Sequence, residues 1–196
     1  MLLARAALKG WTTAMKPCNV LMLPGWQGSR PDHWQSRWER LHGYTRVEQH
    51  DWMRPLRGDW IARLEDVLLS CDGPAVLVAH SLGCQHVAAW AAHSRNTHLV
   101  KAALLAAPPD VEREDVRTLL PSWSPIALGK LPFKTLLFAS NDDPFCSSGR
   151  ARQFAAAWGA QLVDTGARGH LNADSGLSDW PEAHEPFQQL MRDTSA

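Results

Sequence analysis

Short, almost wholly apolar runs alternate with longer amphipathic segments along the 196 residues of this chain, and the alternation limits the folds open to it. Runs such as 74–79 (PAVLVA) carry no charged residue, as expected of strands buried on both faces of a sheet. Alternating strands and helices bring successive strands parallel, with helices on both faces. The pattern therefore predicts an α/β fold, a mostly parallel, doubly wound sheet in three layers.

Six strands and five helices are expected. The strands are expected at 19–25, 45–50, 74–79, 99–109, 133–140 and 160–165. The helices are expected at 31–42, 58–71, 81–94, 147–159 and 179–192. In the first helix Trp34, Trp38 and Leu41 repeat at helical spacing, and Asp59 is a candidate N-cap of the second. In such a sheet, functional residues collect at the carboxyl ends of the strands.

One strand runs directly into a serine. Residues 76–85 (VLVAHSLGCQ) place Ser81 between small residues, Ala79 and Gly83, two positions away on either side. A nucleophilic serine on a tight strand-to-helix turn needs small neighbours, because the backbone there is strained and the strand and helix pack closely. Taken alone, Ser81 is equally compatible with an ordinary helix N-cap.

The loops after two later strands carry residue types that activate a serine. Asp142 and Asp143 follow the fifth expected strand, and His170 follows the last. A neutral imidazole takes the hydroxyl proton during attack and returns it, while a carboxylate behind the ring fixes its tautomer. The order serine, acid, histidine therefore predicts a catalytic triad. Asp143, directly before Pro144, is preferred as the acid, although either aspartate is also a candidate cap for the helix that follows.

The oxyanion formed during such a reaction needs donors that are already in place. At a nucleophile elbow the amide after the serine, here that of Leu82, supplies one donor. An amide in the loop after the first strand supplies the other, and Trp26 is the candidate. This chemistry requires neither a metal ion nor an organic cofactor.

Four segments, PGWQGSRPDHWQ, AHSLGC, SNDDPFCS and GHLNADSGLSDWP, occur in this order and resemble the small α/β-hydrolases of the retinoblastoma-binding-protein-nine/YdeN-like serine hydrolase family. The resemblance runs from about residue 18 to 190. It implies a compact, three-layer α/β-hydrolase fold with a minimal lid, and a triad of nucleophile Ser81, acid Asp143 and base His170. The chain departs from the usual G-x-S-x-G pattern at Ala79, which bears on activity rather than on the fold.

Several neighbours of these residues have simpler structural explanations. His80 is expected to be structural rather than a second base, because adjacent side chains point apart. Asp32 and His33 follow a proline at a helix start, where capping is the simpler expectation and a pocket role the alternative. Cys84 is expected to be a small, packed thiol.

Tryptophans and a possible lid bear on the substrate. Trp26 and Trp123 lie in loops at the expected active edge and are candidates for lining an apolar substrate pocket. Other tryptophans lie on amphipathic helices and are expected in or near the core: Trp34, Trp38 and Trp60. Only residues 109–132 are available for a lid, which predicts a shallow site suited to small or extended esters and amides.

Composition narrows the function classes. Twenty Lys and Arg balance twenty Asp and Glu, so no net field attracts nucleic acid or an anionic membrane. The four cysteines form no C-x-x-C pair and indicate free thiols in a reducing, cytoplasmic setting. Residues 1–14 are expected to be an extension outside a single domain of residues 15–196, or alternatively a targeting segment.

These features predict a serine hydrolase that cleaves an ester of a small molecule through an acyl-enzyme, most simply a carboxylesterase. A peptidase or amidase on the same triad is second. A protein-interaction module with a vestigial triad, or a non-hydrolytic enzyme performing acyl transfer or C–C cleavage, remain as alternatives. The sequence does not indicate the oligomeric state.

Overall fold

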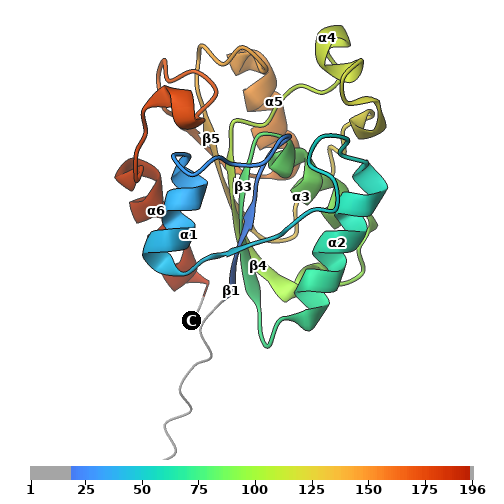
Figure 1. Ribbon diagram of the computed structural model, residues 1–196, viewed down its shortest axis with the longest axis vertical. Helices are drawn as coiled ribbons and strands as arrows, with labels where there is room; N and C mark the ends of the chain where they lie inside the picture. The colour runs from blue at the N-terminus through green and yellow to red at the C-terminus, as the bar shows by residue number, and fades with distance from the viewer. Residues whose placement is uncertain (1–18, 195–196) are drawn as a thin grey trace, which may run out of the picture.

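The structure is a computed structural model that describes residues 19–194. Its strands form one parallel sheet in the order β2-β1-β3-β4-β5-β6 (Figure 1). The strands are β1 (Asn19–Leu23), β2 (Thr45–Arg46), β3 (Ala75–His80), β4 (Val100–Ala106), β5 (Lys134–Ala139) and β6 (Gln161–Asp164). From β1 the chain passes to β2 on one side and then returns to β3 on the other. This reversal opens a crevice at the carboxyl ends of β1 and β3, where sheets of this kind bind ligands.

Helices cover both faces of the sheet. The α-helices are α1 (Trp34–His42), α2 (Arg57–Ser70), α3 (Leu82–His93), α4 (Glu114–Arg117), α5 (Ser148–Trp158) and α6 (Pro181–Asp193). Three short 3-10 helices complete the set: η1 (Thr97–Leu99), η2 (Pro121–Trp123) and η3 (Ala173–Ser175). Figure 1 shows α1 and α6 on one side of the sheet and α2, α3 and α5 on the other.

The apolar runs of the sequence become two separate cores because successive strand residues point to opposite faces. In β3, Leu77 and Ala79 pack into the core under α2, α3 and α5. Val76 and Val78 of the same strand pack into the core under α1 and α6. Every residue of β3 is buried, which explains why this strand has no polar alternation. The predicted three-layer architecture is confirmed.

Tryptophans fill both cores, as expected for Trp34, Trp38 and Trp60. Trp34 lies edge-on to Trp180 at 5.1 Å between ring centroids, and Trp38 stacks on Phe187 at 5.8 Å. Each of the three predicted core tryptophans is at most 1% exposed. The contacts of Trp34 and Trp38 pack α1 against α6, whereas Trp60 packs α2 into the other core.

Some local predictions were wrong. Leu41 is 58% exposed, because it lies in the last turn of α1, outside the face that packs on the sheet. Asp59 does not cap α2: the helix begins two residues earlier, at Arg57, and has no side-chain cap. The second strand is only two residues long, since the chain leaves the sheet after Arg46. The predicted extension 1–14 lies outside the described residues.

Two further findings concern the described part of the chain. No helix among residues 19–194 combines the length and apolar character needed to cross a bilayer. The three cysteines within that range, Cys71, Cys84 and Cys146, are all free thiols.

Candidate active site

Ser81 occupies a strained turn between β3 and α3. Its backbone has φ 53° and ψ −124°, a left-handed conformation that non-glycine residues seldom adopt. The surroundings are correspondingly tight. A Cβ on Gly25 would lie 2.7 Å from the Cβ of Ser81, and a Cβ on Gly83 would meet the carbonyl oxygen of Leu23. The predicted need for a small residue at position 83 is confirmed, and the structure adds Gly25, in the neighbouring loop, to the same requirement.

Ala79 fits its position without distortion of the sheet. It pairs with Leu23 of β1 and Leu105 of β4, and no part of it is exposed. Its methyl group belongs to the core under α2 and α3. The methyl group that alanine adds at this position is therefore accommodated by packing within the sheet.

The structure brings Ser81, His170 and Asp143 into one chain of hydrogen bonds. The Ser81 hydroxyl lies 2.8 Å from Nε2 of His170. Nδ1 of His170 lies 3.0 and 2.9 Å from the two carboxylate oxygens of Asp143. With the ring proton on Nδ1, His170 donates to Asp143 and accepts from Ser81. The Asp143 side chain is 2% exposed and that of His170 is 10% exposed, so this chain of bonds is shielded from water.

Asp142 has a different place from Asp143, although both follow β5. Its Oδ1 accepts from the Ser140 hydroxyl at 2.6 Å and from the Gly169 amide at 2.7 Å. These bonds tie the loop after β5 to the loop that carries His170, and they lower the pKa of Asp142. Neither aspartate caps α5, because the side chain of Ser147 does so.

His80 fixes the loop that carries His170 through a hydrogen bond to its backbone. Nε2 of His80 donates to the backbone oxygen of His170 at 2.9 Å, which holds the loop of His170 in position. Burial, followed by the proximity of His33 and His170, lowers the pKa of His80 well below its usual value, so the ring is neutral. This agrees with the predicted structural role. Cys84 is fully buried, with its thiol directed at the carbonyl of Ala106, and burial raises its pKa.

The two predicted oxyanion donors both belong to residues beside Ser81. Leu82 is the first residue of α3, and amides in the first turn of a helix have no intrahelical acceptor. Trp26 lies in the loop after β1, where the Gly28 amide closes a turn on the Gly25 carbonyl at 3.0 Å. The Trp26 indole is fixed by donation to the Met53 carbonyl at 3.0 Å. Both residues line the cavity described next.

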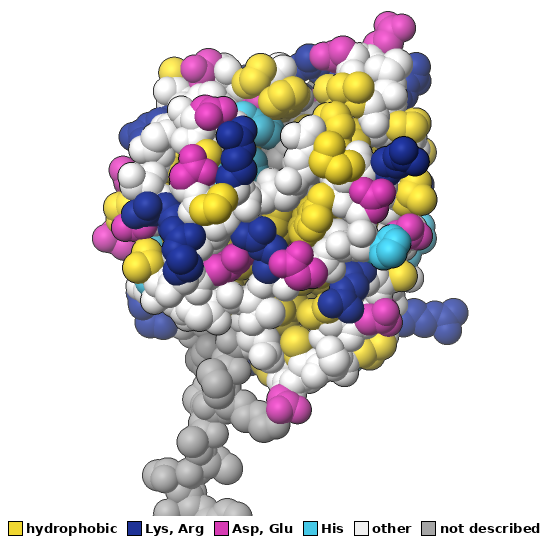
Figure 2. Space-filling view, viewed as in Figure 1, with side chains coloured by type: hydrophobic (Ala, Val, Ile, Leu, Met, Phe, Trp, Pro, Cys, Tyr) yellow, Lys and Arg dark blue, Asp and Glu magenta, His cyan; other side chains and the backbone are white. Residues whose placement is uncertain are grey.

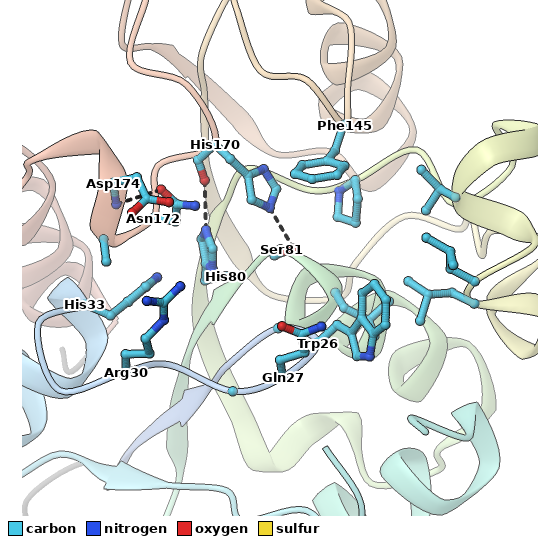
Figure 3. A pocket seen from close by; sticks show the side chains of 18 residues that line it. Trp26, Gln27, Arg30, His33, His80, Ser81, Phe145, His170, Asn172 and Asp174 are labelled. Carbon is cyan, nitrogen blue, oxygen red and sulfur yellow. Dashed lines mark hydrogen bonds between the residues drawn. The ribbon is translucent and has the colours of Figure 1, made fainter. Parts of the chain in front are cut away.

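A cavity of about 360 Å³ opens at Ser81, with two chemically different arms. Figure 3 shows them on opposite sides of Ser81. The apolar arm is formed by Trp26, Leu82, Pro109, Val116, Leu119, Leu120 and Phe145. The polar arm is formed by Arg30, His33, His80, Asn172 and Asp174. Figure 2 shows a hollow on this face with a histidine inside it, hydrophobic side chains on one side and a Lys or Arg side chain on the other.

The predicted pocket role of Trp123 was wrong. Trp123 is 1% exposed and packs edge-on to Trp60 at 5.4 Å, beneath the cavity rather than in its wall. Its indole nitrogen donates to the Pro55 carbonyl at 2.8 Å, which draws η2 inward. Trp26, by contrast, lines the cavity as predicted.

Sequence reasoning missed most of the cavity wall. Val116, Leu119 and Leu120 come from the segment around α4, which forms one edge of the apolar arm. Their spacing of three and four residues was the available signal, because it places them on one face of a helical turn. His33 has both roles that the sequence left open: its Nδ1 accepts from the Gln35 amide to cap α1, and its ring lines the polar arm. The described residues, 19–194, contain no group of three or more His, Cys, Asp or Glu side chains placed to hold a metal ion.

Comparison with solved structures identifies similar folds. A protein of Pectobacterium atrosepticum described as a YdeN-like hydrolase is 29% identical to this chain. The match covers 91% of this chain and 90% of that chain, with a TM-score of 0.75. The ydeN gene product of Bacillus subtilis is 18% identical, with 90% and 100% covered and a TM-score of 0.73. Esterase 2 of Thermogutta terrifontis is 17% identical, with 90% and 83% covered and a TM-score of 0.64. At such identities the last two show the shared fold alone.

A comparison with family profiles gives the family itself. The serine hydrolase profile matches residues 20–189, which include β1, the serine turn and the loops of Asp143 and His170. No curated protein sequence gives a significant match. Since the profile spans most of the chain, this protein belongs to the serine hydrolase family.

Proposed function

We propose that this serine hydrolase cleaves carboxylic esters of small molecules through an acyl-enzyme. Ser81 is the nucleophile, His170 the general base and then general acid, and Asp143 the residue that orients the imidazole. The observation that carries the proposal is the continuous set of hydrogen bonds from Ser81 through His170 to Asp143, located at a strained strand-to-helix turn.

The proposed reaction has two similar halves. In the first, Oγ of Ser81 attacks the ester carbonyl while Nε2 of His170 takes its proton, and the same proton is delivered to the departing alkoxide. In the second, water attacks the acyl-enzyme with His170 again as base, and the carboxylic acid leaves. The amides of Trp26 and Leu82 are proposed to stabilise the oxyanion in both halves.

The size of the cavity supports a small substrate. A volume of about 360 Å³ is at the lower end of the range of small-molecule sites, and the segment at the edge of the cavity contains the short helix α4. The apolar arm offers burial to an alkyl or aryl group beside the scissile bond. Esters are favoured over amides because the alkoxide leaving group demands less of the general acid than an amine does.

Hydrolysis of p-nitrophenyl acetate and butyrate by the purified protein tests the proposal. We expect turnover that falls at least a thousandfold in Ser81→Ala, roughly the loss found when a triad member is removed. Ser94→Ala is a matched control, since Ser94 ends α3 at the opposite end from Ser81. Turnover that survives Ser81→Ala would contradict the assignment of the nucleophile.

The interaction-module alternative makes the opposite prediction. A folded protein with no turnover of any ester and no amide hydrolysis would leave the triad without catalytic activity. In that case the cavity would be a binding site for a partner rather than a catalytic site.

A further inference from the structure

Four residues of the polar arm, Arg30, His33, Asn172 and Asp174, have no part in the reaction steps proposed above. Besides His80, which ends β3, the residues of this arm come from three places: Arg30 from the loop before α1, His33 from the start of that helix, and Asn172 and Asp174 from the segment after His170. Figure 3 shows them together on the side of Ser81 away from Trp26. A group bound there would therefore be fixed relative to the nucleophile.

Arg30 brings an uncompensated positive charge to this arm. Its side chain is exposed, and no ion pair or side-chain hydrogen bond engages it within residues 19–194. Other arginines near α1 are occupied: Arg37 pairs with Asp179 at 2.6 Å and Arg46 with Glu39 at 2.9 Å. A guanidinium at a cavity wall without a protein partner is suited to bind a carboxylate through two parallel hydrogen bonds.

His33 adds a donor that also lacks a partner. Its Nδ1 accepts the Gln35 amide at 3.1 Å, so a neutral ring carries its proton on Nε2. The residue is 4% exposed, and its Nε2 is buried with no hydrogen-bond partner in the part of the chain that the structure describes. Burial, and to a lesser degree the charge of Arg46, lowers the pKa of His33 to about 3, so the ring stays a neutral donor at physiological pH. An acceptor oxygen is the group that this nitrogen lacks.

The side chain of Asn172 also favours a ligand with acceptor oxygens. Its side-chain oxygen is occupied by the Asp174 amide at 3.0 Å, which leaves the amide nitrogen to donate. Among residues 19–194, Asp174 is the one acid that lines the cavity, and its side chain is exposed and forms no ion pair with Arg30. Donors therefore outnumber acceptors on this arm, and a single exposed carboxylate does not neutralise them.

We propose that the polar arm binds a carboxylate of the substrate, so that preferred esters carry an apolar group on one side of the scissile carbonyl and a carboxylate on the other. The inference rests on the proposed ester hydrolysis and names the substrate class for the same site. Arg30 is the specificity-determining residue, and His33 and Asn172 supply further donors to the carboxylate oxygens.

Two series of esters test this proposal, because the carboxylate can lie on either side of the ester bond. The first varies the acyl end: mono-p-nitrophenyl adipate, its methyl-capped diester, and p-nitrophenyl 6-(trimethylammonio)hexanoate. The second varies the leaving group: 3-carboxy-4-nitrophenyl butyrate against p-nitrophenyl butyrate. Each kcat/KM is divided by the rate of spontaneous hydrolysis, which removes differences in intrinsic reactivity.

We expect the carboxylate ester of one series to exceed its neutral counterpart by about tenfold, as for one charge-assisted hydrogen-bonded pair at a partly exposed site. The ratio of kcat/KM for the carboxylate ester to kcat/KM for the neutral ester should fall close to one in Arg30→Ala. In Arg30→Glu the ammonium ester should become the preferred substrate. Arg95→Ala, an equal charge change at an exposed residue beyond the far end of α3, should leave the ratio unchanged.

The possible failures are distinguishable. If the folded protein hydrolyses none of the esters, neutral ones included, the proposed function itself fails. If neutral esters are hydrolysed but neither series shows a preference for the carboxylate, or the preference persists in Arg30→Ala, only the assignment of the polar arm is overturned. A preference of the parent protein for the ammonium ester would assign the arm to Asp174 instead.

Discussion

The carbonyl oxygen of Leu23 leaves no room for a side chain at Gly83, where an added Cβ would lie 2.2 Å from that oxygen. The contact joins the end of β1 to the first turn of α3, and it lets the helix approach the sheet closely enough to present Ser81 at the cavity. The packing of this turn and the position of Ser81 thus depend on the same contact.

Gly83→Ala is therefore expected to destabilise the protein by about 1–3 kcal/mol, the usual cost of overpacking against groups that cannot move freely. Urea unfolding measures the change. Gly58→Ala is the matched control, because Gly58 lies in α2 with nothing within 4 Å of an added Cβ. The control should be neutral or slightly stabilising. Equal effects of the two substitutions would argue against the close contact.

Substitution distinguishes Asp143, the proposed acid of the triad, from its neighbour Asp142. Asp143→Asn should lower kcat for ester hydrolysis by roughly 10³–10⁴-fold, because the amide favours the wrong imidazole tautomer. Asp142→Asn, which weakens only the bonds to Ser140 and Gly169, should change kcat by less than about tenfold. The opposite ranking would show that the loop after β5 places Asp142 behind His170 during the reaction.

Much of this site could be predicted from the sequence because its residues are local to strand ends. Ser81, Asp143 and His170 each follow an apolar run, and parallel strands bring their carboxyl ends to one edge. Trp123 could not be placed in this way. Whether a loop tryptophan faces the cavity or the core depends on a tertiary contact, here with the Pro55 carbonyl.

The convergence of the polar-arm residues could not be predicted from the sequence either. His33 and Arg30 precede a helix, where capping was the simpler expectation, and Asn172 and Asp174 follow the base in an irregular loop. Their convergence depends on how the loops after β1 and β6 lie across the crevice at the carboxyl ends of β1 and β3. No periodicity in the sequence encodes that arrangement.

Buried neutral histidines should make the fold sensitive to mild acid. Burial lowers the pKa of His86 from 6.5 to about 4, despite donation from its Nε2 to the Trp60 carbonyl. Since the unfolded chain binds a proton below about pH 6.5 and the folded ring does not, stability is full above that pH and falls toward pH 4.

His86→Gln tests this linkage. The free energy of unfolding of the parent protein should fall by about 2 kcal/mol more than that of the variant between pH 8 and pH 5, whatever the variant loses at both pH values. Chemical denaturation at the two pH values gives the difference, in which the other histidines cancel. Equal falls in the two proteins would mean that His86 is already charged in the folded state.

Apolar burial beside the nucleophile should contribute to substrate binding. Leu119 is 60% exposed at the edge of the apolar arm, and Leu119→Ala should lower kcat/KM for p-nitrophenyl butyrate by about threefold, as expected for a loss of less than one buried methylene. Leu69→Ala on α2, at 58% exposure, is the matched control and should have no effect. Equal kcat/KM values in both variants would place the substrate elsewhere.

The most direct test of the account is labelling with a fluorophosphonate probe near pH 8, followed by peptide mass mapping. Such a probe reacts with a serine only when its hydroxyl is activated. The account predicts a single adduct on Ser81 that disappears in His170→Ala. A folded protein that acquires no adduct, or one labelled equally with and without His170, would contradict the claim that Ser81, His170 and Asp143 form a working triad.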